Sequence, residues 1–284
     1  MKRTVHKNRN AFSMLELVFV IVILGIVASI GAEVIAKVYQ SYILQRAQQR
    51  ASVKTELASV QIANRLAYAI PGTVIRRVGK AGTPELITEA LGSNPDLYSV
   101  LQWVGYDADS FGSITNGTTN RYPGWSGFCD LDASAGTTLN TPGSNLGLAD
   151  TIIGNLSGTA SLGVDDAAIY FPGYTIQSDI ASYSGSTITL SAAPTTKVEH
   201  YKLAWTSYAL VIEGGDLYLY HNFTPSPSAA IPAATVNNRS LLMTGITTFK
   251  FRGDGRTIRF KVCRSENIGD ADFNVTACKE KAVF

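Results

Sequence analysis

The chain has 284 residues, of which 24 are basic and 22 are acidic, and its formal net charge is +2. Four of the basic residues lie within the first eleven, so the rest of the chain carries 20 basic against 22 acidic residues, a balance that does not predict nucleic-acid binding. Charged residues make up only 16% of the chain, and Gly, Ser, Thr and Tyr are abundant. This composition favours β-structure and surface loops over a helical cytoplasmic enzyme.

The first predicted element is an apolar segment over Phe12–Ala32 that follows a short basic leader. At 1.5 Å per residue the segment spans about 31 Å, the thickness of one bilayer core, so we expect it to cross a membrane. Basic residues favour the cytoplasmic side, so we expect the chain after Ala32 to lie outside the cytoplasm. The basic residues of the leader are Lys2, Arg3, Lys7 and Arg9.

The apolar segment contains one carboxylate, Glu16. A charge at the centre of a membrane helix costs about 2.5 to 3.5 kcal/mol even on lenient scales, so Glu16 predicts a partner. A cleaved signal peptide or an ordinary signal anchor is the alternative interpretation, but only Ser29–Ala32 offers a weak cleavage site. The order of residues before the span is a small residue, Phe, Ser, a hydrophobic pair and Glu, and it resembles the signal of type IV pilins and type II secretion pseudopilins.

This resemblance implies a processing pathway for the N-terminus. In the family a membrane peptidase cuts before the first apolar residue, here the Ala11–Phe12 bond, and the new amine, here that of Phe12, is methylated. The fifth mature residue is a glutamate, here Glu16, which the ammonium of a neighbouring subunit can neutralise. The family normally has Gly where this chain has Ala11, and major pilins usually have Pro where it has Glu33.

Beyond the membrane segment, a helical pattern continues to the first stop signal at Pro71-Gly72. Residues 45–50 (QRAQQR) are polar on every side, as expected where a helix leaves the bilayer before one face docks on a soluble domain. A helix from Phe12 to about Ala69 is about 87 Å long, and the resemblance implies such a stalk helix. The apolar positions that recur at helical spacing are Val34, Val38, Tyr42, Val53, Leu57, Val60 and Leu66.

The next part of the chain gives weaker signals. We predict a short helix over Thr83–Leu91 and a strand over Tyr98–Val104. The stretch from Ser110 to Gly163 is dense in Gly, Asn, Ser and Thr, which predicts long loops. A structureless stretch of this length also suggests that short strands within it are being missed.

Strand signals are clear from residue 167 onward. The Gly214-Gly215-Asp216 turn and the Gly253–Arg256 turn each lie between two apolar or alternating runs, which predicts two β-hairpins. With the long helix and the resemblance, this predicts an α+β, pilin-like fold in which the helix packs on an antiparallel sheet with long loops. The predicted strands are Ala168–Phe171, Thr187–Leu190, Tyr201–Thr206, Tyr208–Glu213, Leu217–Phe223, Thr247–Arg252 and Thr257–Val262.

The chain contains three cysteines. Cys263 and Cys278 enclose fourteen residues, and a disulfide closing this loop in an oxidising compartment contributes about 3 kcal/mol in the chain-entropy model. Such a pair resembles the C-terminal disulfide loop of many pilins. Two free buried thiols are the alternative, and Cys129 is either a buried free cysteine or the true partner of one of the others.

No pattern predicts catalysis, a metal or a cofactor. His200 and His221 have no neighbouring ligands at metal-site spacing. Short acidic pairs lie in loop-like contexts, and although some pseudopilins bind calcium, none of these pairs has calcium-loop spacing, so we interpret them as turn carboxylates. Four tyrosines predict cross-strand packing, with a sugar-binding or adhesive face as the alternative. The acidic pairs are Asp107/Asp109, Asp165/Asp166 and Asp270/Asp272, and the tyrosines are Tyr201, Tyr208, Tyr218 and Tyr220.

The sequence therefore predicts a non-enzymatic minor pseudopilin of a type II secretion system. The alternatives are a minor type IV pilin for adhesion or DNA uptake and a signal-anchored extracytoplasmic binding protein or enzyme that does not assemble. We expect a cleaved leader (1–11), a stalk helix (12–70) and a β-rich domain (71–284). The expected location is the bacterial inner membrane, with the C-terminal domain in the periplasm or on an extracellular filament. The expected partners are the prepilin peptidase, other pilins or pseudopilins and the inner-membrane assembly platform.

Overall fold

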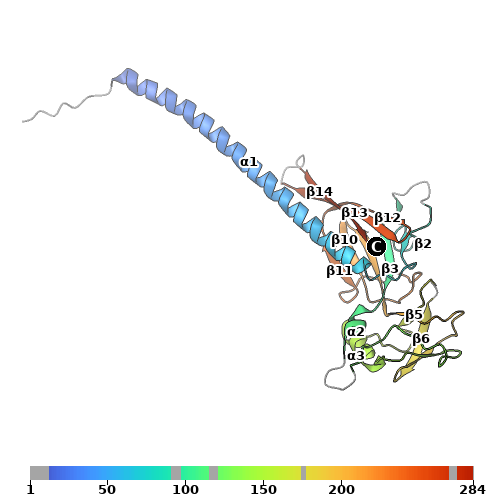
Figure 1. Ribbon diagram of the computed structural model, residues 1–284. Helices are drawn as coiled ribbons and strands as arrows, with labels where there is room; N and C mark the ends of the chain where they lie inside the picture. Colours follow the sequence, from blue (N-terminus) through green and yellow to red (C-terminus); the bar gives the residue numbers. More distant parts are fainter. Residues whose placement is uncertain (1–12, 91–96, 115–120, 174–176, 269–273, 284) are drawn as a thin grey trace, which may run out of the picture.

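A long N-terminal helix dominates the fold. The computed structural model describes residues 13–90, 97–114, 121–173, 177–268 and 274–283. Helix α1 (Met14–Leu66) has 53 residues, which is about 80 Å at 1.5 Å per residue. Figure 1 shows its N-terminal part projecting away from the globular part, which gathers around its C-terminal end. The helix ends close to the predicted boundary, and the chain turns at Gly72, where φ is 85°.

A six-stranded antiparallel sheet lies beside the end of α1, with the strand order β11-β10-β9-β3-β1-β2. The predicted hairpin at Gly214-Gly215 joins β9 to β10, and both glycines have positive φ, which this two-residue turn requires. β3 confirms the strand predicted over Tyr98–Val104. The strands are β1 (Ile75–Arg77), β2 (Glu85–Leu86), β3 (Val100–Gly105), β9 (Thr206–Glu213), β10 (Asp216–Tyr220) and β11 (Arg239–Met243).

A separate three-stranded sheet has the order β12-β13-β14 and packs along α1 (Figure 1). Its strands are β12 (Ile246–Asp254), β13 (Thr257–Asn267) and β14 (Asn274–Val283). The β12–β13 hairpin confirms the prediction from Gly253–Arg256. β14 is missed by the sequence analysis because it alternates polar and small residues and contains one large apolar side chain at each end.

The part of α1 that packs on the sheets does so through small side chains, which let a helix approach its neighbours closely. Ala51 and Ala58 are almost fully buried, whereas Val53 and Leu57, which helped predict the helix, are 59% and 58% exposed. The apolar pattern thus predicts the helix but not its docking face. The buried residues of that face are Ala47, Ala51, Thr55, Ala58, Ser59, Ile62 and Leu66.

A separate lobe is inserted between β3 and β9, over residues 106–205. It contains a five-stranded sheet of order β4-β7-β6-β5-β8 and has its own apolar core around Trp125, Ile153 and Leu203. In Figure 1 it lies beyond the main sheet, away from the projecting part of α1. Its elements are α2 (Ala108–Gly112), β4 (Thr138–Asn140), α3 (Leu146–Ser157), β5 (Ala168–Tyr170), β6 (Ser178–Ser184), β7 (Thr187–Leu190) and β8 (Lys202–Ala204).

The helix predicted over Thr83–Leu91 is wrong. This stretch contains β2, because Glu85 pairs with the buried Arg76 of β1 at 3.2 Å and the short strand follows that pairing. Within Ser110–Gly163, β4 agrees with the expectation that short strands were being missed, whereas α3 was not predicted. The strand predicted over Tyr201–Thr206 is divided at Trp205, where the chain leaves the lobe sheet and enters the main sheet.

Candidate functional site

The helix start lies next to the predicted processing site. Ser13 caps α1, and its hydroxyl oxygen accepts a hydrogen bond from the Glu16 amide at 3.2 Å. This polar cap fixes where the helix begins, so Glu16 lies in the first helical turn. The predicted cleavage bond between Ala11 and Phe12, and the predicted methylation at Phe12, lie outside the described residues.

The N-terminal part of α1 exposes a long apolar surface. Its large apolar side chains from Met14 to Leu44 are 43% to 84% exposed. By length and composition α1 contains a segment that could cross a membrane. Farther along, Glu33 and Lys37 form an ion pair at 2.8 Å one helical turn apart, which reduces the cost of placing their charges there. A surface this apolar requires lipid or other helices around it.

Glu16 is exposed within this apolar surface. Its carboxylate forms no ion pair with any described residue. In a membrane an ionised carboxylate is expensive unless a cation neutralises it.

Ion pairs join the other end of α1 to β14, the C-terminal strand. The carboxylate of Glu56 lies 2.9 Å from Lys281 Nζ and 3.2 Å from Lys279 Nζ, and both lysines belong to β14. Hydrogen bonds from Lys281 and Lys279 lower the pKa of Glu56. The same end of the helix buries Ile62 and Leu66, so packing and charge together fix the helix on the sheets.

Comparison with known proteins adds one match. Residues 6–32 match the family model of the prokaryotic N-terminal methylation motif, which covers the predicted processing site, Glu16 and the apolar segment. The chain therefore carries a prepilin-type N-terminal methylation motif. No curated protein and no solved structure matches the chain. The motif implies processing by a prepilin peptidase and assembly with other pilins, and the α+β arrangement of α1 on antiparallel sheets fits the pilin-like fold.

The cysteine pairing agrees with the sequence prediction. Cys263 and Cys278 lie directly opposite each other on β13 and β14 and form a disulfide. The bond joins the two strands that pack against α1. Cys129 is a free, buried cysteine in the inserted lobe, and Ser134 Oγ lies 3.5 Å from its sulfur. The sulfur therefore belongs to the lobe core.

The histidines and acidic pairs do not form a metal site within the described residues, because no three His, Cys, Asp or Glu side chains there lie close enough together to hold an ion. His221 lies 3.3 Å from Ser240 Oγ, and His200 packs against Phe128. Asp107 is buried and caps α2, and burial raises its pKa. The Asp165/Asp166 pair lies in a turn, and Asp270/Asp272 lies outside the described residues.

The four tyrosines predicted to pack across strands are divided among three places. Tyr208 stacks on its cross-strand partner Trp103 beneath α1, as predicted, and Tyr201 packs on Trp125 in the lobe. Tyr218 and Tyr220 lie on the opposite face of the main sheet. The four are separated because side chains alternate between the two faces of a strand and because Tyr201 lies in a different sheet region.

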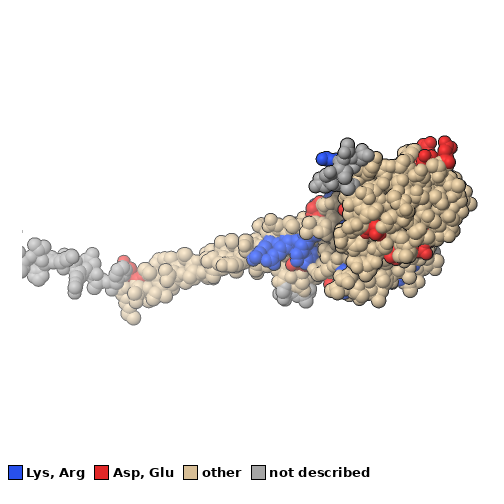
Figure 2. All heavy atoms as spheres, turned by 90° about the horizontal axis from the view of Figure 1, so that it is seen from below, with Lys and Arg blue, Asp and Glu red and all other residues tan. Residues whose placement is uncertain are grey.

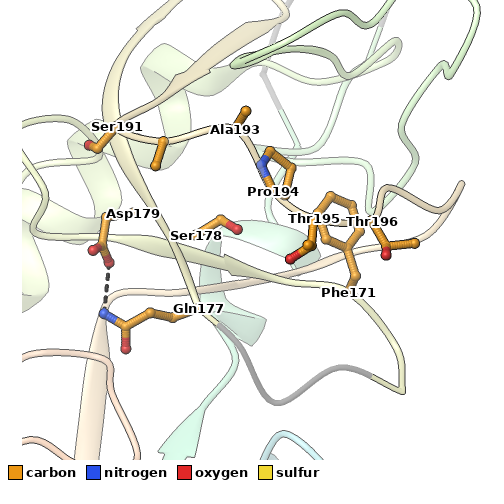
Figure 3. Close-up of a pocket in the computed structure, with 10 residues that line it drawn as sticks. Phe171, Gln177, Ser178, Asp179, Ser191, Ala193, Pro194, Thr195 and Thr196 are labelled. Carbon is orange, nitrogen blue, oxygen red and sulfur yellow. Dashed lines mark hydrogen bonds between the residues drawn. The ribbon is translucent and has the colours of Figure 1, made fainter.

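The lobe also contains a small hollow that the sequence analysis does not identify (Figure 3). It holds about 190 Å³ and is lined by Phe171, by residues 177–179 and by the loop 191–196. Gln177 donates a hydrogen bond to Asp179 at 3.0 Å, and burial raises the pKa of Asp179. The hollow is smaller than the roughly 300 to 1,000 Å³ of typical ligand pockets, so we assign it no ligand.

Proposed function

We propose that the chain is a non-enzymatic structural subunit, namely a minor pseudopilin of a type II secretion pseudopilus. The observation that carries this proposal is the continuity of the methylation motif at 6–32 with α1, whose apolar surface stays exposed as far as Leu44. A helix with this surface fits into a bundle of similar helices. The signal-anchored alternative gives no reason for the motif.

Processing then follows from the motif. The prepilin peptidase removes residues 1–11 by cutting the Ala11–Phe12 bond, and the amine of Phe12 is methylated. The mature chain has a stalk helix over 12–70 and a globular part over 71–284, which lies in the periplasm while the helix crosses the inner membrane once. The new ammonium of one subunit neutralises Glu16 of a neighbour, because opposite charges attract strongly where the dielectric constant is low.

Two features support a minor subunit over the repeating one. The inserted lobe adds 100 residues to one end of the globular part, and so bulky a domain packs poorly in a regular helical array. Glu33 occupies the position where major pilins usually have proline. A subunit of this kind suits a filament tip, where it meets sister pseudopilins and the assembly platform in the inner membrane during initiation.

The decisive experiment is mass spectrometry of the intact protein and of its N-terminal peptide, taken from native membranes with and without the prepilin peptidase. We expect a mature chain that begins at Phe12 and carries one added methyl group only when the peptidase is present. A chain that still begins at Met1, or one cut after the apolar segment, contradicts the proposal.

Assembly is tested separately with Glu16→Gln. This variant is expected to be processed normally but to lose cysteine or chemical cross-links to sister subunits. Glu33→Gln is the matched control, because Glu33 lies on the same exposed helix and pairs with Lys37 of its own chain. Equal cross-linking in both variants contradicts the role of Glu16.

The phenotype of a deletion strain distinguishes a type II secretion system from a type IV pilus. Deleting the gene is expected to stop export of secreted proteins and to leave surface pili unchanged. Loss of pili, adhesion or DNA uptake with normal secretion instead assigns the chain to a type IV pilus.

A further inference from the structure

The main sheet has an unpaired edge at β11. In the described part of the chain, the main chain of residues 239–243 bonds only to β10. In an antiparallel ladder the N–H and C=O groups of successive residues point alternately to the two neighbouring strands. Glu213 and Asp216 close the β9–β10 turn and point toward each other, so three residues later the backbone groups of Leu219 point toward β11 and its partner Ser240. The amide of Leu241 then points outward. Such an edge is a template for another strand.

A cleft of about 370 Å³ lies beside this edge, between α1 and strands β10 and β11. Trp103 lies in its wall and is fully buried, and its indole nitrogen has no hydrogen-bond partner among the described residues. Apolar lining residues such as Leu219 and Leu242 suit an occupant that brings apolar side chains. The other lining residues are Gln61, Ile62, Asn64, Arg65, Leu210 and Ser240.

A row of basic side chains on α1 begins at a separate hollow, which Arg46 and Arg50 line together with Glu266 of β13, and continues along the helix toward the cleft. Arg46, Arg50 and Lys54 are exposed and lie four residues apart, so they share one helix face. Arg65 lies at the cleft, and at 100° per residue it projects from the same side of α1 as Lys54. Figure 2 shows the basic atoms gathered where the stalk reaches the globular part. Within the described residues none of these four cations is ion-paired with a carboxylate.

We propose that the edge of β11 and its cleft bind an extended acidic segment of a partner protein. The segment adds to β11 as a further strand, which satisfies the outward amide of Leu241. Its apolar side chains enter the cleft. Its acidic side chains meet Arg65 and the basic row. This mode of strand addition obtains affinity from the main chain and specificity from alternate side chains.

The test uses the full chain in dodecyl maltoside micelles and a fluorescein-labelled peptide of about twelve residues that alternates leucine or valine with glutamate. Fluorescence anisotropy is expected to show binding that weakens with added salt. The same peptide with lysine in place of glutamate is expected not to bind. Equal binding of both peptides overturns the proposal.

Two variants locate the site. Leu241→Pro removes the outward amide and is expected to weaken binding at least tenfold, whereas Val236→Pro, in an exposed turn, leaves it unchanged. Arg50→Glu is expected to weaken binding about tenfold, whereas Arg121→Glu, in the inserted lobe, has no effect. Circular dichroism confirms that each variant is folded. Unchanged binding in Leu241→Pro or Arg50→Glu overturns the proposal.

A membrane surface is the competing occupant of the basic row. Binding of the chain to phosphatidylglycerol vesicles through Arg46, Arg50 and Lys54, with no peptide binding, overturns the proposal in favour of a lipid contact.

Discussion

Two substitutions that shorten side chains of similar size test which face of α1 packs on the sheets. Ile62 is 1% exposed and packs in the core shared with Trp103 and Phe260, whereas Leu57 is 58% exposed. Replacing a buried Ile by Ala costs about 2 to 5 kcal/mol, because apolar contacts are lost and a cavity remains. Replacing an exposed side chain usually changes stability by less than about 0.5 kcal/mol. Helix propensity favours Ala over Ile and Leu, so it does not produce the difference.

The assay is urea unfolding of the full chain in neutral detergent micelles, followed by tryptophan fluorescence. With a urea dependence of about 2 kcal/mol per molar, Ile62→Ala is expected to lower the midpoint by about 1 to 2.5 M. Leu57→Ala is expected to lower it by less than about 0.3 M. If Leu57→Ala is as damaging as Ile62→Ala, the docking face of α1 is the one with large apolar residues, and the arrangement described above is refuted.

Three further predictions concern the disulfide and two carboxylates. Replacing Cys263 and Cys278 by Ser is expected to lower the free energy of unfolding by about 3 kcal/mol in oxidising buffer, and dithiothreitol should bring the wild-type chain to the same value. Two lysines of β14 lower the pKa of Glu56, so their ion pairs with its carboxylate stabilise the folded chain. This stabilisation is present above the unfolded-state pKa of about 4.5 and is lost as pH falls through the folded-state pKa. Melting temperatures between pH 6 and 3 should therefore fall less in Glu56→Gln than in the wild type, while Glu280→Gln, on the outer face of β14, should follow the wild type. Burial raises the pKa of Asp107, so ionising this carboxyl in the folded chain costs stability, which is lost as pH rises from the unfolded-state pKa of about 3.8 through the folded-state pKa. Asp107→Asn is therefore expected to melt no lower than the wild type at pH 7, and Asp107→Ala to lose about 1 kcal/mol with the cap of α2.

The sequence predicts the parts of this fold that rest on strong local signals. The long helix follows from an apolar span and helical spacing that continue without a break to Pro71-Gly72. The two hairpins follow from glycine-rich turns, since the positive φ at Gly214 and Gly215 excludes most other residues. The Cys263–Cys278 bond follows from family resemblance and spacing, and the register of β13 with β14 places the two residues opposite each other.

Other parts depend on distant contacts that local patterns do not contain. β2 has two residues and forms because Glu85 meets Arg76, a pairing that depends on where β1 lies. α3 is hidden among glycines and asparagines, although Asn145 provides its cap and Gly158 its left-handed end. The docking face of α1 was not identified because its small residues carry little apolar signal. The cleft beside β11 is assembled from α1, β3, β9, β10 and β11, so no local motif could reveal it.

The inserted lobe and the stalk differ in charge, and the fold keeps them apart. Residues 106–205 contain nine acidic and three basic residues, whereas the basic row of Arg46, Arg50 and Lys54 lies on α1. Ile70, Val104 and Tyr170 pack together where the lobe meets the end of the stalk, and the Tyr170 hydroxyl donates to Pro225 at 2.5 Å, so the orientation of the lobe is fixed. An acidic segment that approaches β11 is therefore attracted by the stalk and repelled by the lobe. This asymmetry favours approach from the side of the stalk over approach from the far end of the molecule.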